Sequence, residues 1–161
     1  RKGGTMVYVG DGNNVARSLL SGAAYLGVRF VWTGPEGYRI DREYVDRVRA
    51  KVPGVEFVEE LDPHEAVKEA DVIYTDVWAS MGQEDEAAMR EKKFAAYQIN
   101  DKLMQSAPKT AIAMHCLPAH RGLEITDEVI DGPRSTVYEE SENRMHVYRG
   151  IFSLLAGGWR K

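Results

Sequence analysis

The sequence has few of the features that mark extracellular, membrane or nucleic-acid-binding proteins. It contains a single cysteine, Cys116, so no disulfide can form within the chain, and this composition suits a reducing compartment. No apolar run approaches the roughly 20 residues that a membrane-spanning helix needs. The formal net charge of −4 predicts no basic surface for nucleic acid. We therefore expect a cytoplasmic protein that binds a small molecule.

The chain also lacks an initiating methionine and any sign of an internal domain boundary. Arg1 is its first residue, and Met6 already lies in the first expected strand, so we expect the chain to be part of a longer polypeptide. Its 161 residues are 43% hydrophobic and 29% charged, which is typical of one folded domain. We expect that single domain to span residues 1–161.

Strand-like and helix-like segments alternate along the whole chain. This order is typical of an α/β fold with a doubly wound, mostly parallel, Rossmann-like sheet flanked by helices on both faces. The expected strands lie at residues 6–9, 29–33, 55–59, 72–75, 111–115 and 135–138. The expected helices lie at residues 15–26, 41–52, 63–70, 84–94, 101–106, 127–130 and 144–155. Asp62 before Pro63 marks one helix start, and Gly27 marks one helix end.

Three polar segments follow expected strands, where ligands of open parallel sheets bind. They are residues 10–14 (GDGNN), 76–83 (DVWASMGQ) and 115–118 (HCLP). Because the carboxyl ends of parallel strands meet at one edge of the sheet, we expect these three segments to be neighbours in space.

The first of these segments is similar to a dinucleotide-binding loop, but it departs from that pattern. Val15 stands where the third glycine would be, and the second strand ends in Thr33 and Gly34 without the acid that binds ribose. A nicotinamide cofactor is therefore disfavoured. Asn13 or Asn14 is expected to cap the following helix, or to bind a ligand carboxylate or amine.

Asp76 and Cys116 are the candidate chemical groups. Asp76 directly follows an apolar strand, where a carboxylate needs a positive partner such as a substrate ammonium, although an ordinary loop position is the alternative. A lone cysteine is usually a small buried side chain. His115 and Cys116 point to opposite faces of a strand, which argues against a thiol protease pair. The histidines show no metal-ligand spacing with Cys116, so no metal site is expected.

Together these motifs resemble those of the ornithine-binding second domain of ornithine carbamoyltransferases, in the same order. The matching segments are residues 10–14, 76–84, 115–118 and 142–144 (ENR), and the resemblance spans about residues 6–155. Members of that family transfer a carbamoyl group from carbamoyl phosphate to the side-chain amine of ornithine, giving citrulline and phosphate. The resemblance implies no metal and no organic cofactor, and it implies a trimeric parent enzyme.

The resemblance also implies roles for individual residues. Ornithine would be bound by Asn14, Asp76, Ser80 and Met81. Cys116, the carbonyl of Leu117 and Arg144 would lie at the carbamoyl group of carbamoyl phosphate, so that Cys116, Arg144 and Asp76 are the expected catalytic residues. The peptide bond between Leu117 and Pro118 would be cis.

The first-domain motifs of the family, Ser-Thr-Arg-Thr and His-Pro-x-Gln, do not occur in this sequence. We therefore expect a half-enzyme that lacks the carbamoyl phosphate-binding domain, with residues 144–155 carrying an apolar face for that absent domain. Two alternatives stay open: a carbamoyltransferase for another amine, such as putrescine or aspartate, and an amino-acid-binding module without catalysis.

Overall fold

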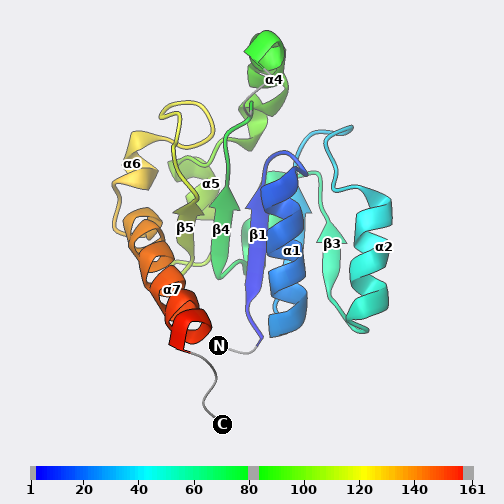
Figure 1. The fold of residues 1–161 in the computed structure, drawn as a ribbon. Helices are drawn as coiled ribbons and strands as arrows, with labels where there is room; N and C mark the ends of the chain where they lie inside the picture. The colour runs from blue at the N-terminus through cyan, green and yellow to red at the C-terminus, as the bar shows by residue number, and fades with distance from the viewer. Residues whose placement is uncertain (1–2, 80–83, 158–161) are drawn as a thin grey trace.

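Five short apolar segments form one parallel sheet in the computed structural model, which describes residues 3–79 and 84–157. The strands are β1 (Thr5–Val9), β2 (Arg29–Thr33), β3 (Phe57–Glu59), β4 (Val72–Thr75) and β5 (Ile112–His115). Their order across the sheet is β3-β2-β1-β4-β5, and every neighbouring pair is parallel (Figure 1). The carboxyl ends of β1, β4 and β5 therefore lie side by side at one edge.

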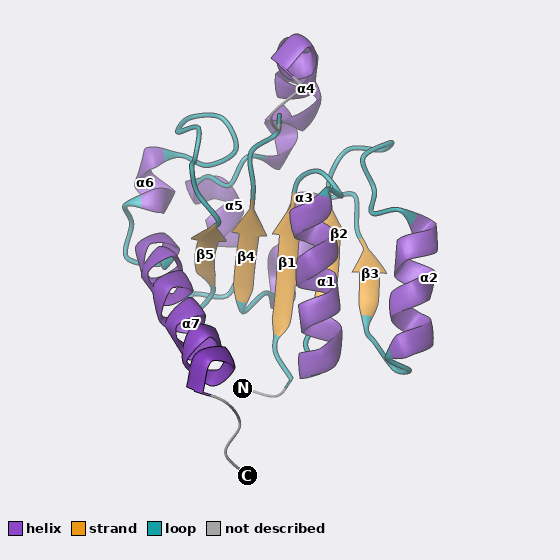
Figure 2. Ribbon diagram, in the orientation of Figure 1, coloured by secondary structure: helices purple, strands orange, loops and turns teal. Residues whose placement is uncertain are grey.

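Helices cover both faces of the sheet because the strand residues are apolar on both sides (Figure 2). Val7 and Ile73 face the side covered by α3 (Pro63–Ala66), α5 (Asp101–Ser106) and α6 (Asp127–Ile130). Tyr8 and Trp32 face the side covered by α1 (Asn14–Leu26) and α2 (Arg42–Lys51). The predicted doubly wound α/β fold is confirmed.

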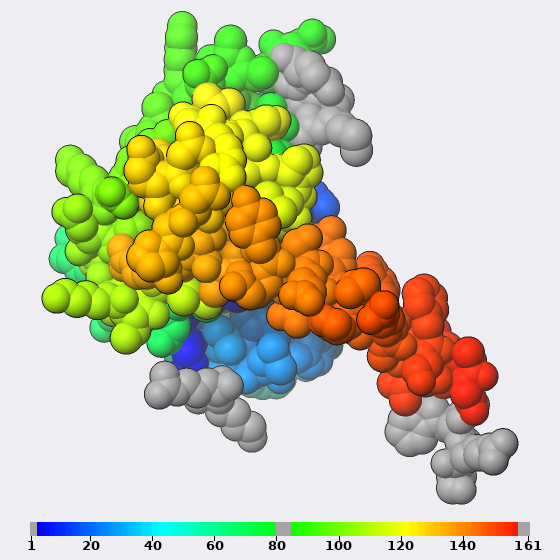
Figure 3. All heavy atoms as spheres, turned by 90° about the vertical axis from the view of Figure 1, so that its left-hand side faces the viewer, coloured from blue at the N-terminus to red at the C-terminus, as the bar shows by residue number. Residues whose placement is uncertain are grey.

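Two helices extend beyond this layered core. Helix α4 (Ala87–Phe94) follows a 3-10 turn at Glu84–Glu86 and stands at the carboxyl edge, while α7 (Val137–Gly157) runs beside β5 (Figure 1). The far end of α7 projects from the body of the molecule (Figure 3). Two further 3-10 turns lie at Val67–Glu69 and Ala95–Tyr97. Among the described residues, no helix is long and apolar enough to cross a membrane.

The helix boundaries confirm two local predictions. Asp62 caps α3 by accepting hydrogen bonds from the backbone N–H groups of His64 and Glu65, with Pro63 as the first helical residue. Gly27 ends α1 in the left-handed conformation, at φ 66°, which glycine adopts without a steric penalty.

The predicted sixth strand at residues 135–138 is wrong. Ser135 makes only an isolated bridge to Ala113, and α7 begins at Val137 rather than at residue 144. Thr136, Val137 and Tyr138 favour strands by intrinsic preference, but the Glu140 N–H donates to the Thr136 carbonyl and starts the helix there. Tertiary context overrides a weak local preference for strand.

Candidate functional site

Asp76 is the meeting point of the three segments that follow β1, β4 and β5. Its side chain is almost buried, with the residue 8% exposed. Oδ1 accepts hydrogen bonds from the Cys116 thiol at 3.0 Å and from the Val77 N–H at 2.8 Å, and Oδ2 accepts one from the Asn13 amide at 3.0 Å. The predicted convergence of residues 10–14, 76–83 and 115–118 is therefore confirmed for the described residues.

Asn13 connects Asp76 to the start of α1. Its Oδ1 accepts hydrogen bonds from the N–H groups of Val15 and Ala16, at 2.9 and 3.1 Å, and so caps the helix. The same side chain donates through Nδ2 to Asp76. Asn14 occupies the first position of α1 and is exposed to solvent. The cap is thus provided by Asn13, and Asn14 remains available to a ligand.

The Cys116 thiol is held in its protonated form. Burial raises the pKa of Cys116, and the hydrogen bond to Asp76 and the negative charges of Asp76 and Glu140 raise it further, to about 12. A thiol with this pKa is a hydrogen-bond donor at neutral pH rather than a thiolate nucleophile. Cys116 is therefore suited to donating a hydrogen bond, here to Asp76.

His115 points to the opposite face of β5, as predicted, and pairs with Glu124. Both side chains are fully buried, and His115 Nε2 lies 3.1 Å from Glu124 Oε1. The Leu117 N–H donates to His115 Nδ1 at 2.9 Å, so the ring proton sits on Nε2 and is donated to Glu124. Glu124 also accepts from the His120 N–H. This buried pair holds the backbone N–H groups of Leu117 and His120.

The turn after β5 has an unusual backbone conformation and is contacted by Arg144. The Leu117–Pro118 peptide bond is cis, as the resemblance implies, and Leu117 has a positive φ of 55°. Arg144 reaches this turn from α7, and its Nη2 donates to the Cys116 carbonyl at 3.0 Å. Arg144 and Cys116 are therefore brought together, as the sequence predicts.

Glu140 stands one helical turn before Arg144 and anchors α7 to the sheet. Its Oε1 accepts a hydrogen bond of 2.6 Å from the Tyr74 hydroxyl, at the carboxyl end of β4. Burial, followed by this hydrogen bond, holds the pKa of Tyr74 above its ordinary value. With Asp76, Glu140 and Arg144 close to Cys116, carboxylates outnumber guanidinium groups around the thiol. The site therefore favours a positively charged ligand group.

Comparison with known proteins identifies the family of this domain. Residues 2–155 match the family model described as aspartate/ornithine carbamoyltransferase, Asp/Orn binding domain. The chain belongs to this family. It is similar to the ornithine carbamoyltransferase of Pyrococcus abyssi, with 51% identity over 159 residues that cover 98% of this chain and 50% of the relative. The ornithine carbamoyltransferase of Caldicellulosiruptor saccharolyticus is 49% identical over 155 residues, covering 95% of this chain and 50% of the relative.

Solved structures of carbamoyltransferases show the same fold. The structure of the ornithine carbamoyltransferase of Pyrococcus furiosus superposes with a TM-score of 0.89 at 49% identity, over 99% of this chain and 51% of that one. The Gloeobacter violaceus ornithine carbamoyltransferase gives 0.83 at 43% identity, over 94% of this chain and 50% of that one. The chain thus spans about half the length of the curated relatives it matches.

Gly12 lets the turn after β1 pack closely against another part of the chain. Its N–H donates to the Tyr38 carbonyl at 2.7 Å, and a side chain at this position would overlap the backbone of Arg39 and Ile40. The close approach that glycine permits is therefore used by the protein's own chain, where a nucleotide-binding loop would receive a pyrophosphate.

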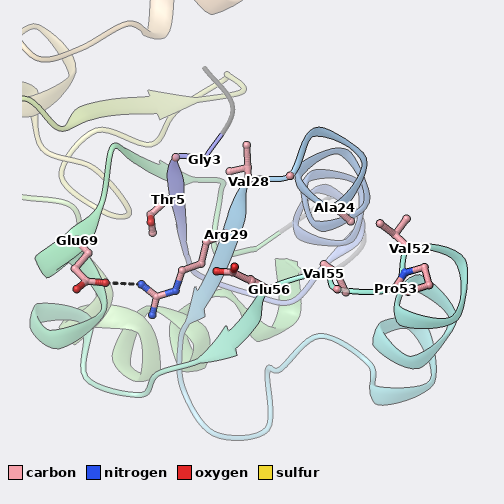
Figure 4. Close-up of a pocket in the computed structure, with 13 residues that line it drawn as sticks. Gly3, Thr5, Ala24, Val28, Arg29, Val52, Pro53, Val55, Glu56 and Glu69 are labelled. Atoms are coloured by element: carbon pink, nitrogen blue, oxygen red, sulfur yellow. Dashed lines mark hydrogen bonds and ion pairs between the residues drawn. The ribbon is translucent and has the colours of Figure 1, made fainter.

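Two hollows in the described part of the surface lie away from Asp76. One of about 400 Å³ sits at the opposite edge of the sheet, lined by residues such as Thr5, Arg29 and Glu56 (Figure 4). Another, of about 620 Å³, lies beside α2. Neither contains Asp76 or Cys116, so the candidate site is defined by converging hydrogen-bonding groups. The predicted ligands Ser80 and Met81 lie outside the described residues.

Sequence reasoning missed the partners that hold the predicted residues. Asn13 binds Asp76 itself, whereas Glu124 binds His115 beside Cys116 and Glu140 binds Tyr74 on the strand before Asp76. Asn13 was recognisable as a possible helix cap or ligand-binding amide, but not as a partner of Asp76. Glu124 and Glu140 have no distinguishing pattern, because each gains its role from a residue brought near by the fold.

Proposed function

We propose that the chain is the ornithine-binding half of an ornithine carbamoyltransferase. Asp76 is the observation that carries this proposal: a nearly buried carboxylate, fixed by Asn13 and Cys116 at the carboxyl edge of a parallel sheet. A buried carboxylate with neutral donors around it gains most from a cationic partner. The names of the similar proteins agree with an amine substrate of this kind.

In the proposed reaction, the neutral side-chain amine of ornithine attacks the carbon of the carbamoyl group. A C–N bond forms, the bond from that carbon to the phosphate oxygen breaks, phosphate leaves, and the amine loses a proton. Asp76 and Asn14, with Ser80 and Met81, would bind ornithine. Cys116, the Leu117 carbonyl and Arg144 would lie at the carbamoyl group, where Arg144 would stabilise negative charge that develops on the carbamoyl oxygen.

The excess of carboxylates favours an amine-bearing amino acid over aspartate. Asp76 and Glu140 would repel the side-chain carboxylate of aspartate. Ornithine has no such carboxylate, and its α-ammonium would be attracted to Asp76. Putrescine carries two amines but lacks the carboxylate of an amino acid. Comparing putrescine with ornithine therefore tests whether the site binds that carboxylate. Ornithine is proposed over putrescine because the similar proteins are named ornithine carbamoyltransferases.

The proposed parent enzyme needs a second domain that binds carbamoyl phosphate. Helix α7 exposes a series of large apolar side chains that would pack against such a domain. They are Met145, Val147, Tyr148, Ile151, Phe152, Leu154 and Leu155. We also propose that the intact enzyme is a trimer, as the family resemblance implies, and that it is cytoplasmic, since its lone cysteine suits a reducing compartment.

A carbamoyl-transfer assay on the intact protein, which follows amine-dependent phosphate release and identifies each carbamoylated product, tests the proposed function. Carbamoyl phosphate is supplied with ornithine, putrescine or aspartate, and kcat/KM is compared among the three amines. We expect kcat/KM for ornithine to exceed the others by about a hundredfold or more, as a site that pairs charged substrate groups discriminates strongly. Preference for putrescine or aspartate, or no transfer to any amine, would contradict it.

A further inference from the structure

Arg90, on α4, is a charged side chain buried at the carboxyl edge. Its side chain is 7% exposed, and its Nη1 lies 2.6 Å from Asp11 Oδ2. Nη1 also donates to the Trp78 carbonyl at 3.1 Å, and Nε donates to Glu86 at 3.0 Å. The guanidinium lies 5.0 Å from the centre of the Tyr38 ring. Four separate parts of the chain therefore meet at one side chain.

Two partners of Arg90 belong to segments that contain or contact Asp76. Asp11 belongs to the turn after β1 and lies two residues before Asn13, which donates to Asp76. Trp78 lies two residues after Asp76, and its ring stacks on Phe94 of α4 at 6.0 Å. Figure 1 shows α4 standing beyond the carboxyl end of β4. Arg90 thus connects both segments that approach Asp76 to one helix.

A guanidinium is suited to this connection in a way that other side chains are not. Its planar fork presents several N–H donors in fixed directions, so it can bind a carboxylate and a carbonyl together, whereas a lysine ammonium acts as a point charge. Burying a charge is unfavourable unless its partners compensate, and replacing such a pair with apolar groups often leaves stability unchanged. Stability alone therefore does not explain a buried arginine here.

We propose that Arg90 is a positioning residue for the amine substrate. By holding Asp11 and the Trp78 carbonyl, it keeps the turn after β1 and the segment after β4 at the separation that places Asn13 and Asp76 together. Arg90 itself does not touch the reacting atoms. This inference rests on the proposed function, because the substrate whose binding it supports is ornithine.

The test compares substitutions at Arg90 and Asp11 in the intact protein by steady-state kinetics. Arg90→Gln should raise KM for ornithine about tenfold or more and leave KM for carbamoyl phosphate within about twofold. Arg90→Lys should raise KM for ornithine less than Arg90→Gln does, because lysine keeps the charge but not the planar group of donors. The Arg90→Gln/Asp11→Asn double variant should be no worse than the more impaired of the two single variants, since both single substitutions remove the ion pair between Arg90 and Asp11. Arg47→Gln, at an exposed arginine of α2 paired with Glu43, is the matched control and should change neither KM.

Three results would overturn the positioning role. The first is a KM for ornithine that stays within about twofold in a folded Arg90→Gln protein. The second is an equal rise in KM for ornithine and for carbamoyl phosphate. The third is a double variant in which the effects of the two single substitutions on KM for ornithine add. If Arg90→Gln does not fold, Asp11→Asn decides, because it removes the charge partner while leaving the arginine in place. Failure of the unaltered protein to carbamoylate ornithine would refute the proposed function, whereas normal activity with an insensitive Arg90 refutes only the positioning role.

Discussion

The two edges of the sheet differ in how they hold polar side chains. At the carboxyl edge, Asp76 is 8% exposed and shares hydrogen bonds with Asn13 and Cys116. At the amino edge, Arg29 and Glu69 form a 2.6 Å ion pair whose side chains are 33% and 75% exposed, beside an open hollow (Figure 4). Solvent screens the ion pair at the amino edge far more than it screens the nearly buried carboxylate of Asp76. Function should therefore depend on the carboxyl edge and tolerate change at the amino edge.

The largest expected difference is in the reactivity of the half-buried Cys116 thiol. Because the pKa of Cys116 is raised from 9.0 to about 12, its thiolate fraction at pH 8 should be about a thousandfold lower than in the unfolded chain. Alkylation by iodoacetamide should be slower by about that factor, and its rate should keep rising with pH to about pH 12. Cys116 is the only cysteine in this chain, so labelling followed by mass spectrometry reports it directly.

Asp76→Asn is the matched control for this reactivity. Removing the carboxylate charge removes a cause of the raised pKa of Cys116, so the folded variant should react faster than the unaltered chain. Equal alkylation rates in the folded and unfolded chain would show that Asp76 and burial do not raise the pKa of the Cys116 thiol.

Asp76→Asn should also have the largest effect on substrate binding. If Asp76 pairs with the α-ammonium of ornithine, as we propose, the loss of its charge should raise KM for ornithine about a hundredfold in the intact protein, or about 2.7 kcal/mol. Binding of carbamoyl phosphate should change little. Asp71→Asn makes the same substitution at the amino end of β4, where Asp71 is exposed and accepts from the Thr5 N–H, and KM should be unchanged. Equal weakening of both substrates by Asp76→Asn would indicate a structural role.

Cys116→Ala should have a smaller effect that is confined to turnover. We expect kcat in the intact protein to fall about tenfold or more, or about 1.4 kcal/mol of transition-state stabilisation. The melting temperature should stay within a few degrees, since the side chain is small and only partly buried. An unchanged kcat would exclude the thiol from the transfer step.

The smallest effect is expected at the amino edge. Arg29→Gln or Glu69→Gln should change the free energy of unfolding by less than about 1 kcal/mol, because exposed ion pairs contribute little. Urea unfolding measures this change, and KM for ornithine should stay the same. A rise in KM for ornithine would mean that the two edges do not differ in function.

Much of this fold follows from sequence pattern, because the apolar runs and their punctuation are local. The first, second and fourth strands, the α1 stop at Gly27 and the α3 start at Asp62 were all predictable in this way. The strand predicted at residues 135–138 failed, since the start of α7 depends on contacts with β5 that local preference does not contain.

Some residues of the candidate site could likewise be predicted from the sequence, and others could not. Asp76 and Cys116 follow strands, so their meeting could be predicted from the rule that carboxyl ends share an edge. Arg90, Glu124 and Glu140 could not be predicted, because their partners are set by packing of the helices and turns that carry them.

We propose that this chain supplies the amine half of a two-part site, and a citrulline assay on the 161-residue chain alone tests that claim. Catalysis requires amine and carbamoyl carbon to be held together, and such proximity is worth about 7–11 kcal/mol. The folded chain alone, verified by a cooperative thermal transition, should produce no citrulline above background, while the intact protein produces it under the same conditions. Sustained turnover by the chain alone would contradict the claim, because the carbamoyl phosphate site would then lie within these residues.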